Sequence, residues 1–492
     1  MVITAALPSL AAMTDLMPLW IAGAAVHGET TFEIRNPYDN HLVATTSYAT
    51  DDQVERAVAA AAAVRHEAAA LPIHTRADAL AEAGRAVAER AEEFARLITA
   101  ESGKPLFWAR AEVGRAISVF RVAAEATRVW SGEVMRLDTD GAAEGRLAYV
   151  RRVPKGPVLA VSPFNFPLNL VVHKVAPAIA VGAPVVVKPA PRTPLSALLL
   201  GEIIAGLRLP AGMVSVINVP DTKAPALVAD DRLPIVSFTG SGPVGTAIAA
   251  AVPHKHVVLE LGGNAAAYVG ADFCRPGDLD RAAGRIATFA NYQAGQSCIS
   301  VQRVFADAAV YGEVKQRLVA AVEALPTGDP ADERTRVGPL IDAAAAERVE
   351  HQVEEPVAAG ARLLTGGVRN GTTYAPTVLE DVPADAKVMC EEVFGPVVVL
   401  HQVDGADDAF HRINDSRFGL QAGVFTHDIQ LAFRAHRELE VGGVIIGDVP
   451  SYRADQMPYG GVKGSGVGRE GVRFAMTDYT YERVMVLTGV DL

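Results

Sequence analysis

The sequence predicts an α/β protein that contains two parallel sheets, each covered by helices. From Pro157 to Leu259, short β-branched runs bounded by Gly or Pro alternate with helical stretches. A second alternating region runs from Asp280 to about Gly447. Because parallel strands need a crossover connection, usually a helix, this alternation is typical of sheets covered on both faces.

An Ala-rich segment from Thr50 to Ala126 precedes these regions and carries apolar residues at helical spacing. Val54, Val58 and Ala61 recur at intervals of three to four residues, as on one face of a helix. We expect three or four helices in this segment.

The elements expected in the first alternating region are short strands and the helices between them. The strands are Val158–Val161, Val185–Val187, Val214–Val219, Ile235–Phe238 and Val257–Leu259. The helices are His173–Ala180, Pro194–Ala205, Ala224–Ala229 and Val244–Ala251. In the second region we expect a long helix over Asp280–Ala294 and strands near Val301–Phe305, Val397–His401, Ala422–Thr426 and Val444–Ile446.

Two further segments alternate apolar and polar residues but belong clearly to neither sheet. They are Arg146–Val153 and Tyr479–Leu487. Because an isolated strand exposes unpaired backbone groups, we expect each segment to pair with another strand, which can belong to another subunit.

The composition describes an acidic globular chain. It has 492 residues with a formal net charge of −12, and 50% of its residues are hydrophobic. We find no cluster of Lys and Arg that would neutralise a phosphate backbone or anionic lipid, so we expect neither nucleic acid nor a membrane surface as partner. The longest apolar runs, such as Ala57–Val64, are far shorter than the roughly 20 residues that span a bilayer.

The chain start and the cysteines favour a reduced compartment. Met1–Thr4 contains no Lys or Arg before the apolar stretch, unlike the start of a secretory signal, and we expect a cytoplasmic protein. Cys274, Cys298 and Cys390 are an odd and sparse set, which argues against a disulfide framework or a zinc site. We expect no metal centre.

A thiol follows a Gly-containing turn in the segment Asn291-Tyr292-Gln293-Ala294-Gly295-Gln296-Ser297-Cys298. Small residues there would let a substrate approach the sulfur closely, which makes Cys298 a candidate nucleophile. The alternative is that Cys298 is a small buried residue, the usual state of a lone cysteine.

Two other segments offer groups that such a nucleophile needs. Glu260 ends an expected buried strand, and its carboxylate could activate a water, although a helix cap or surface salt bridge is the alternative. Asn165 lies between Pro163 and Pro167, which stiffen the loop that presents its amide. A rigid amide donor suits an oxyanion hole, although Asn between prolines is also a turn signal.

A nucleotide site is indicated by Phe238-Thr239-Gly240-Ser241-Gly242-Pro243-Val244-Gly245, which follows a strand and opens a helix. Backbone N–H groups at such a helix start can bind a pyrophosphate. Lys188 adds a cation at the carboxyl end of a strand, where ligands lie in open α/β sheets.

Taken in order, these segments resemble the aldehyde dehydrogenase superfamily, from about Thr14 to the end of the chain. Glu391–Pro396 and Met457–Gly466 are further matching segments. The resemblance implies a Rossmann-like cofactor domain, an α/β catalytic domain and a small β oligomerisation element. It implies an NAD(P)-binding domain of residues 14–137 and 157–260, a catalytic domain of 261–460, and an oligomerisation element of 138–156 and 475–492 that builds a homodimer or homotetramer.

By this resemblance, Cys298 attacks an aldehyde as the thiolate, and the Asn165 amide and the Cys298 N–H hold the oxyanion. Hydride then passes to NAD or NADP, and Glu260 activates the water that hydrolyses the thioester. Glu470 matches a position implicated in proton relay. A free cysteine has a pKa of about 8.5, and no helix is obvious after Cys298, so the source of the thiolate stays open.

The resemblance also assigns a set of cofactor-binding residues. Lys188 and Glu392 would bind ribose hydroxyls, and Phe394 would pack beside the nicotinamide ribose. Where many NAD-preferring members carry a Glu, this chain has Pro191, so its sequence is compatible with both NAD and NADP. The full set is Ser162, Pro163, Phe164, Lys188, Pro191, Arg192, Gly240, Ser241, Gly245, Leu261, Glu392 and Phe394.

The substrate is less constrained. Arg453 stands where a branch with lactaldehyde and glyceraldehyde dehydrogenases is similar, and a guanidinium near the substrate mouth would suit a small polar or anionic aldehyde. A structural salt bridge of Arg453 is the alternative. Phe166 and Ser297 are further substrate candidates, and Phe166 with Phe120 and Trp130 would instead make an apolar tunnel for an aliphatic or aromatic aldehyde.

Two other functions remain open. A CoA-acylating semialdehyde dehydrogenase would resolve the thioester with CoA, although Glu260 favours water. A catalytically silent member would be kept as a binding or structural protein.

Overall fold

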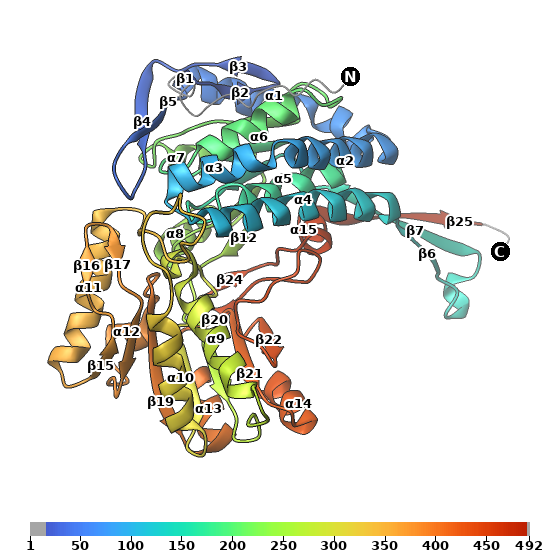
Figure 1. The fold of residues 1–492 in the computed structure, drawn as a ribbon. Helices are drawn as coiled ribbons and strands as arrows, with labels where there is room; N and C mark the ends of the chain where they lie inside the picture. The colour runs from blue at the N-terminus through green and yellow to red at the C-terminus, as the bar shows by residue number, and fades with distance from the viewer. Residues whose placement is uncertain (1–15, 490–492) are drawn as a thin grey trace, which may run out of the picture.

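Two large sheets, each flanked by helices, form the framework of the protein (Figure 1). The computed structural model describes residues 16–489. It places eight strands in the first sheet, seven in the second, and three in a small sheet that projects away from both. The predicted α/β fold class is confirmed.

The first sheet has the strand order β24-β12-β11-β8-β9-β10-β2-β3. Its strands are β2 (Leu19–Ile21), β3 (Ala24–Val26), β8 (Val158–Val161), β9 (Val185–Lys188), β10 (Val214–Val216), β11 (Ile235–Thr239), β12 (His256–Glu260) and β24 (Gly466–Val467). The connecting helices are α5 (Asn169–Val181), α6 (Leu195–Ala205), α7 (Ala224–Ala229) and α8 (Gly242–Ala251). Strands β8 to β12 are parallel, and the order reverses between β8 and β11, where open α/β sheets bind ligands.

The five predicted strands of this sheet are all present, although β10 ends at Val216 rather than Val219. The edge strands β24 and β3, and β2 beside β3, were not predicted. Each is only two or three residues long, too short for an alternating pattern to distinguish it from a loop.

The Ala-rich segment forms four helices, as predicted. They are α1 (Asp51–Ala70), α2 (Ile73–Glu89), α3 (Ala91–Ser102) and α4 (Leu106–Val129). Helix α1 packs on the first sheet, and the other three pack over α5 and α6. Thr50 and Gln53 form a capping box that starts α1, and Gly103 ends α3 in the left-handed conformation with φ +70°. Helix α4 packs against α2, α3 and α5, which brings it beside the loop after β8. Strands β1 (Leu16–Met17), β4 (Thr30–Arg35) and β5 (Leu42–Tyr48) form a separate small sheet.

The second sheet has the order β15-β18-β19-β14-β13-β21-β22. Its strands are β13 (Ala266–Val269), β14 (Arg303–Asp307), β15 (Arg362–Thr365), β18 (Thr377–Glu380), β19 (Val397–Val403), β21 (Gln421–Phe425) and β22 (Gly443–Ile446). The helices of this part are α9 (Asp278–Asn291), α10 (Tyr311–Glu323), α11 (Ala343–Ala358), α12 (Lys387–Cys390), α13 (Gly405–Asn414) and α14 (Ile429–Glu438). Alternate residues of β13 enter hydrophobic clusters on opposite faces, Ala267 and Val269 on one and Ala266 and Tyr268 on the other.

The prediction of one helix over Asp280–Ala294 is wrong at its end. Helix α9 stops at Asn291, and a tight turn follows in which Gln293 and Ala294 adopt left-handed φ values of +42° and +58°. Small and polar residues continue the helical pattern here, so the sequence carries no stop signal before Gly295.

The third sheet consists of β6 (Glu133–Arg136), β7 (Arg146–Pro154) and β25 (Thr480–Thr488), and it extends sideways in Figure 1. The two segments that the sequence assigned to neither large sheet form β7 and β25, which pair with each other as antiparallel strands. Strand β6 also belongs to this sheet, although the predicted division assigned it to residues 14–137. Residues 14, 15 and 490–492 of that division lie outside the described residues.

The remaining elements are short. They are β16 (Arg369–Asn370), β17 (Thr373–Tyr374), β20 (Phe418–Gly419), β23 (Val462–Lys463) and α15 (Val472–Asp478). Within residues 16–489, no helix is both long and apolar enough to cross a membrane.

Candidate active site

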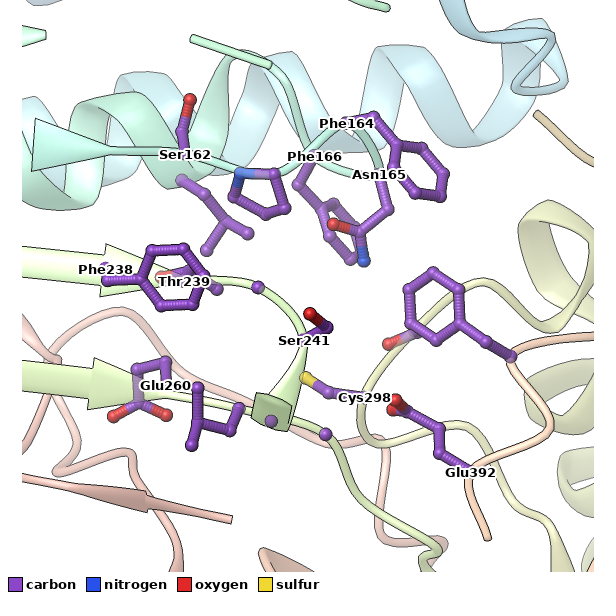
Figure 2. A pocket seen from close by; sticks show the side chains of 18 of the residues that line it. Ser162, Phe164, Asn165, Phe166, Phe238, Thr239, Ser241, Glu260, Cys298 and Glu392 are labelled. Carbon is purple, nitrogen blue, oxygen red and sulfur yellow. The ribbon is translucent and has the colours of Figure 1, made fainter. Parts of the chain in front are cut away.

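A cavity of about 1730 Å³ lies between the carboxyl ends of the first sheet's strands and the loops of the second sheet. Figure 2 shows the Asn165 amide and the Cys298 thiol directed into it, with Glu260 and Glu392 at its sides. Seventeen predicted site residues line it: Ser162, Pro163, Phe164, Asn165, Phe166, Lys188, Pro191, Gly240, Ser241, Glu260, Leu261, Glu392, Phe394, Ser297, Cys298, Arg453 and Glu470. Gly245 and Arg192 do not.

The turn after α9 presents Cys298. It brings Gly295 so close to the second sheet that a Cβ there would lie 2.0 Å from the Gly395 carbonyl oxygen. On the other side, a Cβ on Gly263 would lie 2.3 Å from the carbonyl oxygen of Cys298. Both positions therefore require glycine, and together they fix the backbone that carries the thiol.

Among the described residues, the Cys298 sulfur has one polar partner, the Tyr459 hydroxyl at 2.9 Å. Burial raises the pKa of the Cys298 thiol to about 12, and the hydrogen bond to Tyr459 acts in the opposite direction. The chain continues into β14, so the pKa is not lowered by a helix that starts after Cys298.

Asn165 is held beside the thiol. Its Nδ2 donates to the Gln296 carbonyl at 2.9 Å, which ties the loop after β8 to the turn that carries Cys298. Among residues 16–489, the Cys298 N–H donates no hydrogen bond within the protein. The Asn165 amide is therefore hydrogen-bonded to the segment that carries the free Cys298 N–H, and two donors close to the thiol are what an oxyanion hole requires.

Glu260 is buried at the end of β12, and neither of its carboxylate oxygens has a hydrogen-bond partner in the described part of the chain. Burial and the nearby charge of Glu470 raise its pKa well above the ordinary value. The alternatives of a helix cap or a surface salt bridge are therefore wrong. A carboxylate with a raised pKa is a stronger base toward a water molecule.

Glu470 has the opposite environment. Burial would raise its pKa, but the charges of Lys174, 2.8 Å away, and Arg453, 3.0 Å away, lower it below the ordinary value. Lys174 was not predicted. The sequence feature that could have identified it is a lone charge among the apolar residues of α5, because burying a charge without a partner is costly.

Arg453 forms a structural salt bridge, the alternative that its sequence position left open. It is buried and pairs with Glu470, and its guanidinium carbon lies 3.8 Å from the centre of the Tyr459 ring. It also lines the cavity, and its Nε has no partner among the described residues. Arg115, 3.1 Å from Asp455, is a second cation on the same wall.

The predicted apolar tunnel is wrong in two of its three residues. Phe166 lines the cavity, but Phe120 is buried in the core and Trp130 ends α4 beneath Arg152. Trp108, Phe289 and Tyr292 form the aromatic wall instead. The Tyr292 hydroxyl donates to Ser297 Oγ at 2.5 Å, which orients Ser297.

Most of the predicted cofactor residues follow strands of the first sheet, whereas Glu392 and Phe394 lie just before β19 of the second sheet. Lys188 pairs with Asp221 at 2.8 Å, and Ser162 Oγ is buried without a partner in the described residues. Glu392 accepts a hydrogen bond from the Gly263 N–H at 3.0 Å, and burial raises its pKa to about 7. Phe394 meets Phe164 edge to face, with ring centres 5.8 Å apart.

Two of the residues assigned to cofactor binding, Arg192 and Gly245, lie outside the cavity. Arg192 is turned outward and pairs with Asp342 at 3.0 Å. Gly245 lies in α8, where a Cβ would meet Leu261 at 2.4 Å, so this glycine serves the packing of the helix against β12 and the residue after it. Among residues 16–489 no group of His, Cys, Asp or Glu is arranged to hold a metal ion.

Comparisons with known proteins agree with this geometry. The model of the Aldehyde dehydrogenase family matches residues 20–485. A 3-sulfolactaldehyde dehydrogenase from Priestia aryabhattai is 41% identical over 481 residues, which cover 96% of this chain and all of the relative.

Two solved structures have the same fold. Aldehyde dehydrogenase 21 from Physcomitrella patens, in complex with its reaction product succinate, is 44% identical with a TM-score of 0.95 and covers 97% of this chain and 99% of its own. An NADP-dependent glyceraldehyde-3-phosphate dehydrogenase from Bacillus halodurans, complexed with NADP, is 32% identical with a TM-score of 0.92 and covers 96% and 99%. This chain therefore belongs to the aldehyde dehydrogenase family and is an NAD(P)-dependent enzyme that oxidises an aldehyde.

Proposed function

We propose that this enzyme oxidises a small aldehyde that carries an anionic group, and that Cys298, Asn165 and Glu260 perform the chemistry. The observation that carries the proposal is that these three groups and the cations Arg115 and Arg453 line one cavity. The cations would bind the substrate's anion while the thiol meets its carbonyl carbon.

The residues on the first sheet fit a dinucleotide. The buried Ser162 Oγ supplies a hydrogen-bonding group without a protein partner, and Lys188 supplies a cation. Helix α8 begins at Gly242 without a side-chain cap, which leaves N–H groups for a pyrophosphate beside Gly240 and Ser241. When bound, NAD or NADP supplies the acceptor for the hydride that leaves the substrate carbon.

In the first half of the reaction, the Cys298 thiolate adds to the aldehyde carbon and forms a thiohemiacetal. The negative charge moves to the former carbonyl oxygen, where the Asn165 amide and the Cys298 N–H donate hydrogen bonds. Oxidation of this carbon leaves a thioester on Cys298.

In the second half, Glu260 removes a proton from a water molecule that attacks the thioester carbon. The carbon–sulfur bond then breaks, which releases the carboxylate product and restores the Cys298 thiolate. The negative charge of Glu470 makes Glu260 a stronger base. Lys174 and Arg453 hold Glu470 ionised, although their own charges lower the pKa of Glu260. Because a base lines the cavity, we propose water rather than CoA as the acyl acceptor, and acid must form without CoA.

The preference for an anion rests on Arg115 and Arg453. Asp455 Oδ1 accepts hydrogen bonds from Arg115 Nε and Nη2, which leaves Nη1 of Arg115 for a substrate. Arg453 Nε is likewise without a partner among the described residues. The succinate and 3-sulfolactaldehyde in the names of two relatives both carry an anionic group on a short chain. Trp108 and Phe289 are the observation that favours an aromatic or aliphatic aldehyde instead.

Arg115→Met tests the substrate class. A charge-assisted hydrogen bond is worth about 1.5–3 kcal/mol, so kcat/KM for a four-carbon semialdehyde acid should fall roughly 10- to 150-fold. The same variant should act normally on butanal, which has equal length and no charge. Arg121→Met, on the exposed face of the same helix, is the matched control. Equal losses of kcat/KM on both aldehydes, or a wild-type preference for butanal, would refute the proposal. Separate assays with NAD and with NADP decide which cofactor the enzyme uses.

The oligomer is a further part of the proposal. Strand β25 exposes the consecutive apolar residues Val484, Met485, Val486 and Leu487, which we propose to be covered by another copy of the chain in a homodimer or homotetramer. Light scattering of Val484→Lys, compared with the wild type, tests this assignment.

We also propose a cytoplasmic location and no membrane or nucleic-acid partner. All three cysteines are unpaired, including the reactive one, and a reduced compartment preserves such a thiol. Cell fractionation and binding measurements with vesicles and DNA test these statements.

A further inference from the structure

We propose that Tyr459 is a further catalytic residue, whose hydroxyl donates a hydrogen bond to the Cys298 thiolate and so favours the reactive form of the nucleophile. This inference rests on the proposed role of Cys298. It answers a question that the sequence left open, because the described chain continues from Cys298 into β14 and not into a helix whose N-terminus would stabilise the thiolate.

The contact is direct and its geometry is fixed. Tyr459 Oη lies 2.9 Å from Cys298 Sγ, and both side chains line the cavity. The Tyr459 N–H donates to the Glu470 carbonyl at 3.0 Å, and the Glu470 N–H donates to the Tyr459 carbonyl at 2.7 Å. Two backbone hydrogen bonds therefore hold the tyrosine in place before any substrate arrives.

Arg453 makes the hydroxyl a better donor. Its guanidinium lies over the Tyr459 ring at 3.8 Å, where a cation withdraws electron density from the ring. The same positive charge lowers the pKa of the Cys298 thiol, but its effect is smaller than those of burial, of the hydrogen bond to Tyr459 and of the Glu392 and Glu260 charges, which raise this pKa.

The other groups that face the sulfur do not perform this task. Glu260 from β12 and Glu392 before β19 are acidic, and their charges oppose a thiolate. Tyr292, from the turn after α9, donates its hydroxyl to Ser297. Among the titratable groups near the sulfur, the Tyr459 hydroxyl alone is in hydrogen-bond contact with it in the described residues.

The proton balance is simple. The thiol proton passes to water in the cavity, and Tyr459 keeps its own proton and donates it as a hydrogen bond to sulfur. As the carbon–sulfur bond forms, the negative charge leaves the sulfur for the aldehyde oxygen. The hydrogen bond therefore stabilises the thiolate before attack and again when the thiolate departs from the thioester.

The test is the pH dependence of Cys298 alkylation by iodoacetamide in the full chain, followed by mass spectrometry of the Cys298 peptide. Tyr459→Phe removes the hydroxyl and keeps the ring beneath Arg453. A lost hydrogen bond to a charged group should raise the midpoint by about one pH unit, so alkylation below the midpoint slows about tenfold. Tyr374→Phe, which removes a buried hydroxyl from a separate hydrophobic cluster, should leave the midpoint unchanged.

An unchanged midpoint in Tyr459→Phe overturns the inference, and so does a lowered one, because it would mean that the hydroxyl stabilises the neutral thiol. If Tyr459→Phe does not fold, 3-fluorotyrosine at position 459 decides the question. Its more acidic hydroxyl must lower the midpoint, and no change or a rise refutes the role.

Failure of the proposed function gives a different result. If Cys298→Ala retains full turnover, the nucleophile has been assigned wrongly, whatever the midpoint of Cys298 alkylation. If Cys298→Ala is inactive while Tyr459→Phe keeps the wild-type midpoint, only the role of Tyr459 is wrong.

Discussion

Glu112 is predicted to support both the stability of the protein and the position of Asn165. It is buried on α4, where one carboxylate oxygen pairs with Lys104 and the other accepts the N–H groups of Leu168 and Asn169, both at 3.0 Å. These N–H groups begin helix α5, directly after the loop that carries Asn165. Glu112→Ala removes all of these contacts at once.

The expected loss follows from the buried ammonium that remains. Burial lowers the pKa of Lys104, and the attraction of Glu112 opposes this change. Removing one partner of a buried ion pair costs about 3–5 kcal/mol. At about 2.1 cal/mol/K of unfolding entropy per residue, this chain unfolds with about 1 kcal/mol/K, so Tm should fall by about 3–5 °C.

Thermal unfolding of the wild type and three variants measures this prediction. Lys104→Met combined with Glu112→Gln removes both charges and keeps an acceptor for the two N–H groups, so it should recover most of the lost Tm. Glu125→Ala, in an exposed pair with Arg121 on the same helix, should shift Tm by less than about 1 °C, because surface pairs contribute about 0–1 kcal/mol. The kcat of folded Glu112→Ala should also fall, because the loop of Asn165 loses its anchor. The reasoning fails if Glu112→Ala behaves like Glu125→Ala, or if the double variant is no more stable than the single one.

Three further predictions concern the site and its pH dependence. Asn165→Ala should lower kcat about 10²- to 10³-fold, as loss of an oxyanion donor does, and a smaller effect than that of Gln296→Ala would contradict its role. Glu260→Gln should accumulate the acyl form of Cys298, visible by mass spectrometry, and in the wild type hydrolysis should accelerate as pH rises through the raised pKa of Glu260, because the base must be ionised. His173 is buried, and burial followed by the charge of Arg453 lowers its pKa from 6.5 to about 4. Its neutral form is therefore favoured in the folded state, so stability is complete above about pH 6.5 and decreases by up to about 3 kcal/mol as pH falls toward 4. His173→Gln should reduce the difference in Tm between pH 7 and pH 5, and an unchanged difference would exclude His173 as its source.

Local patterns were sufficient for the fold class and for the main chemical groups. The β-branched runs predicted β8, β9, β11 and β12 because a strand buried on both faces must be apolar throughout. Asn165, Glu260 and Cys298 were found because each stands where a strand or helix gives way to a Pro- or Gly-containing loop. Such signals extend over a few residues and do not depend on the rest of the chain.

The substrate wall shows why other residues were not predictable. Trp108, Arg115 and Phe120 all belong to α4, but only the first two line the cavity. At 3.6 residues per turn, Arg115 returns to the face of Trp108, whereas Phe120 lies roughly 120° away from it. The helical period places Trp108 and Arg115 together, but only packing against α5 decides that their face is the one that meets the cavity.

The sequence by itself determined an α/β protein of the aldehyde dehydrogenase family, because its strand pattern and its nucleophile, amide and carboxylate are each written in short segments. Only the tertiary structure decided that Arg192 points away from the cavity, that Lys174 and Arg453 surround Glu470, and that the Tyr459 hydroxyl contacts the Cys298 sulfur. These contacts join residues far apart in the chain, and their geometry depends on how the two large sheets pack together, which no local pattern specifies.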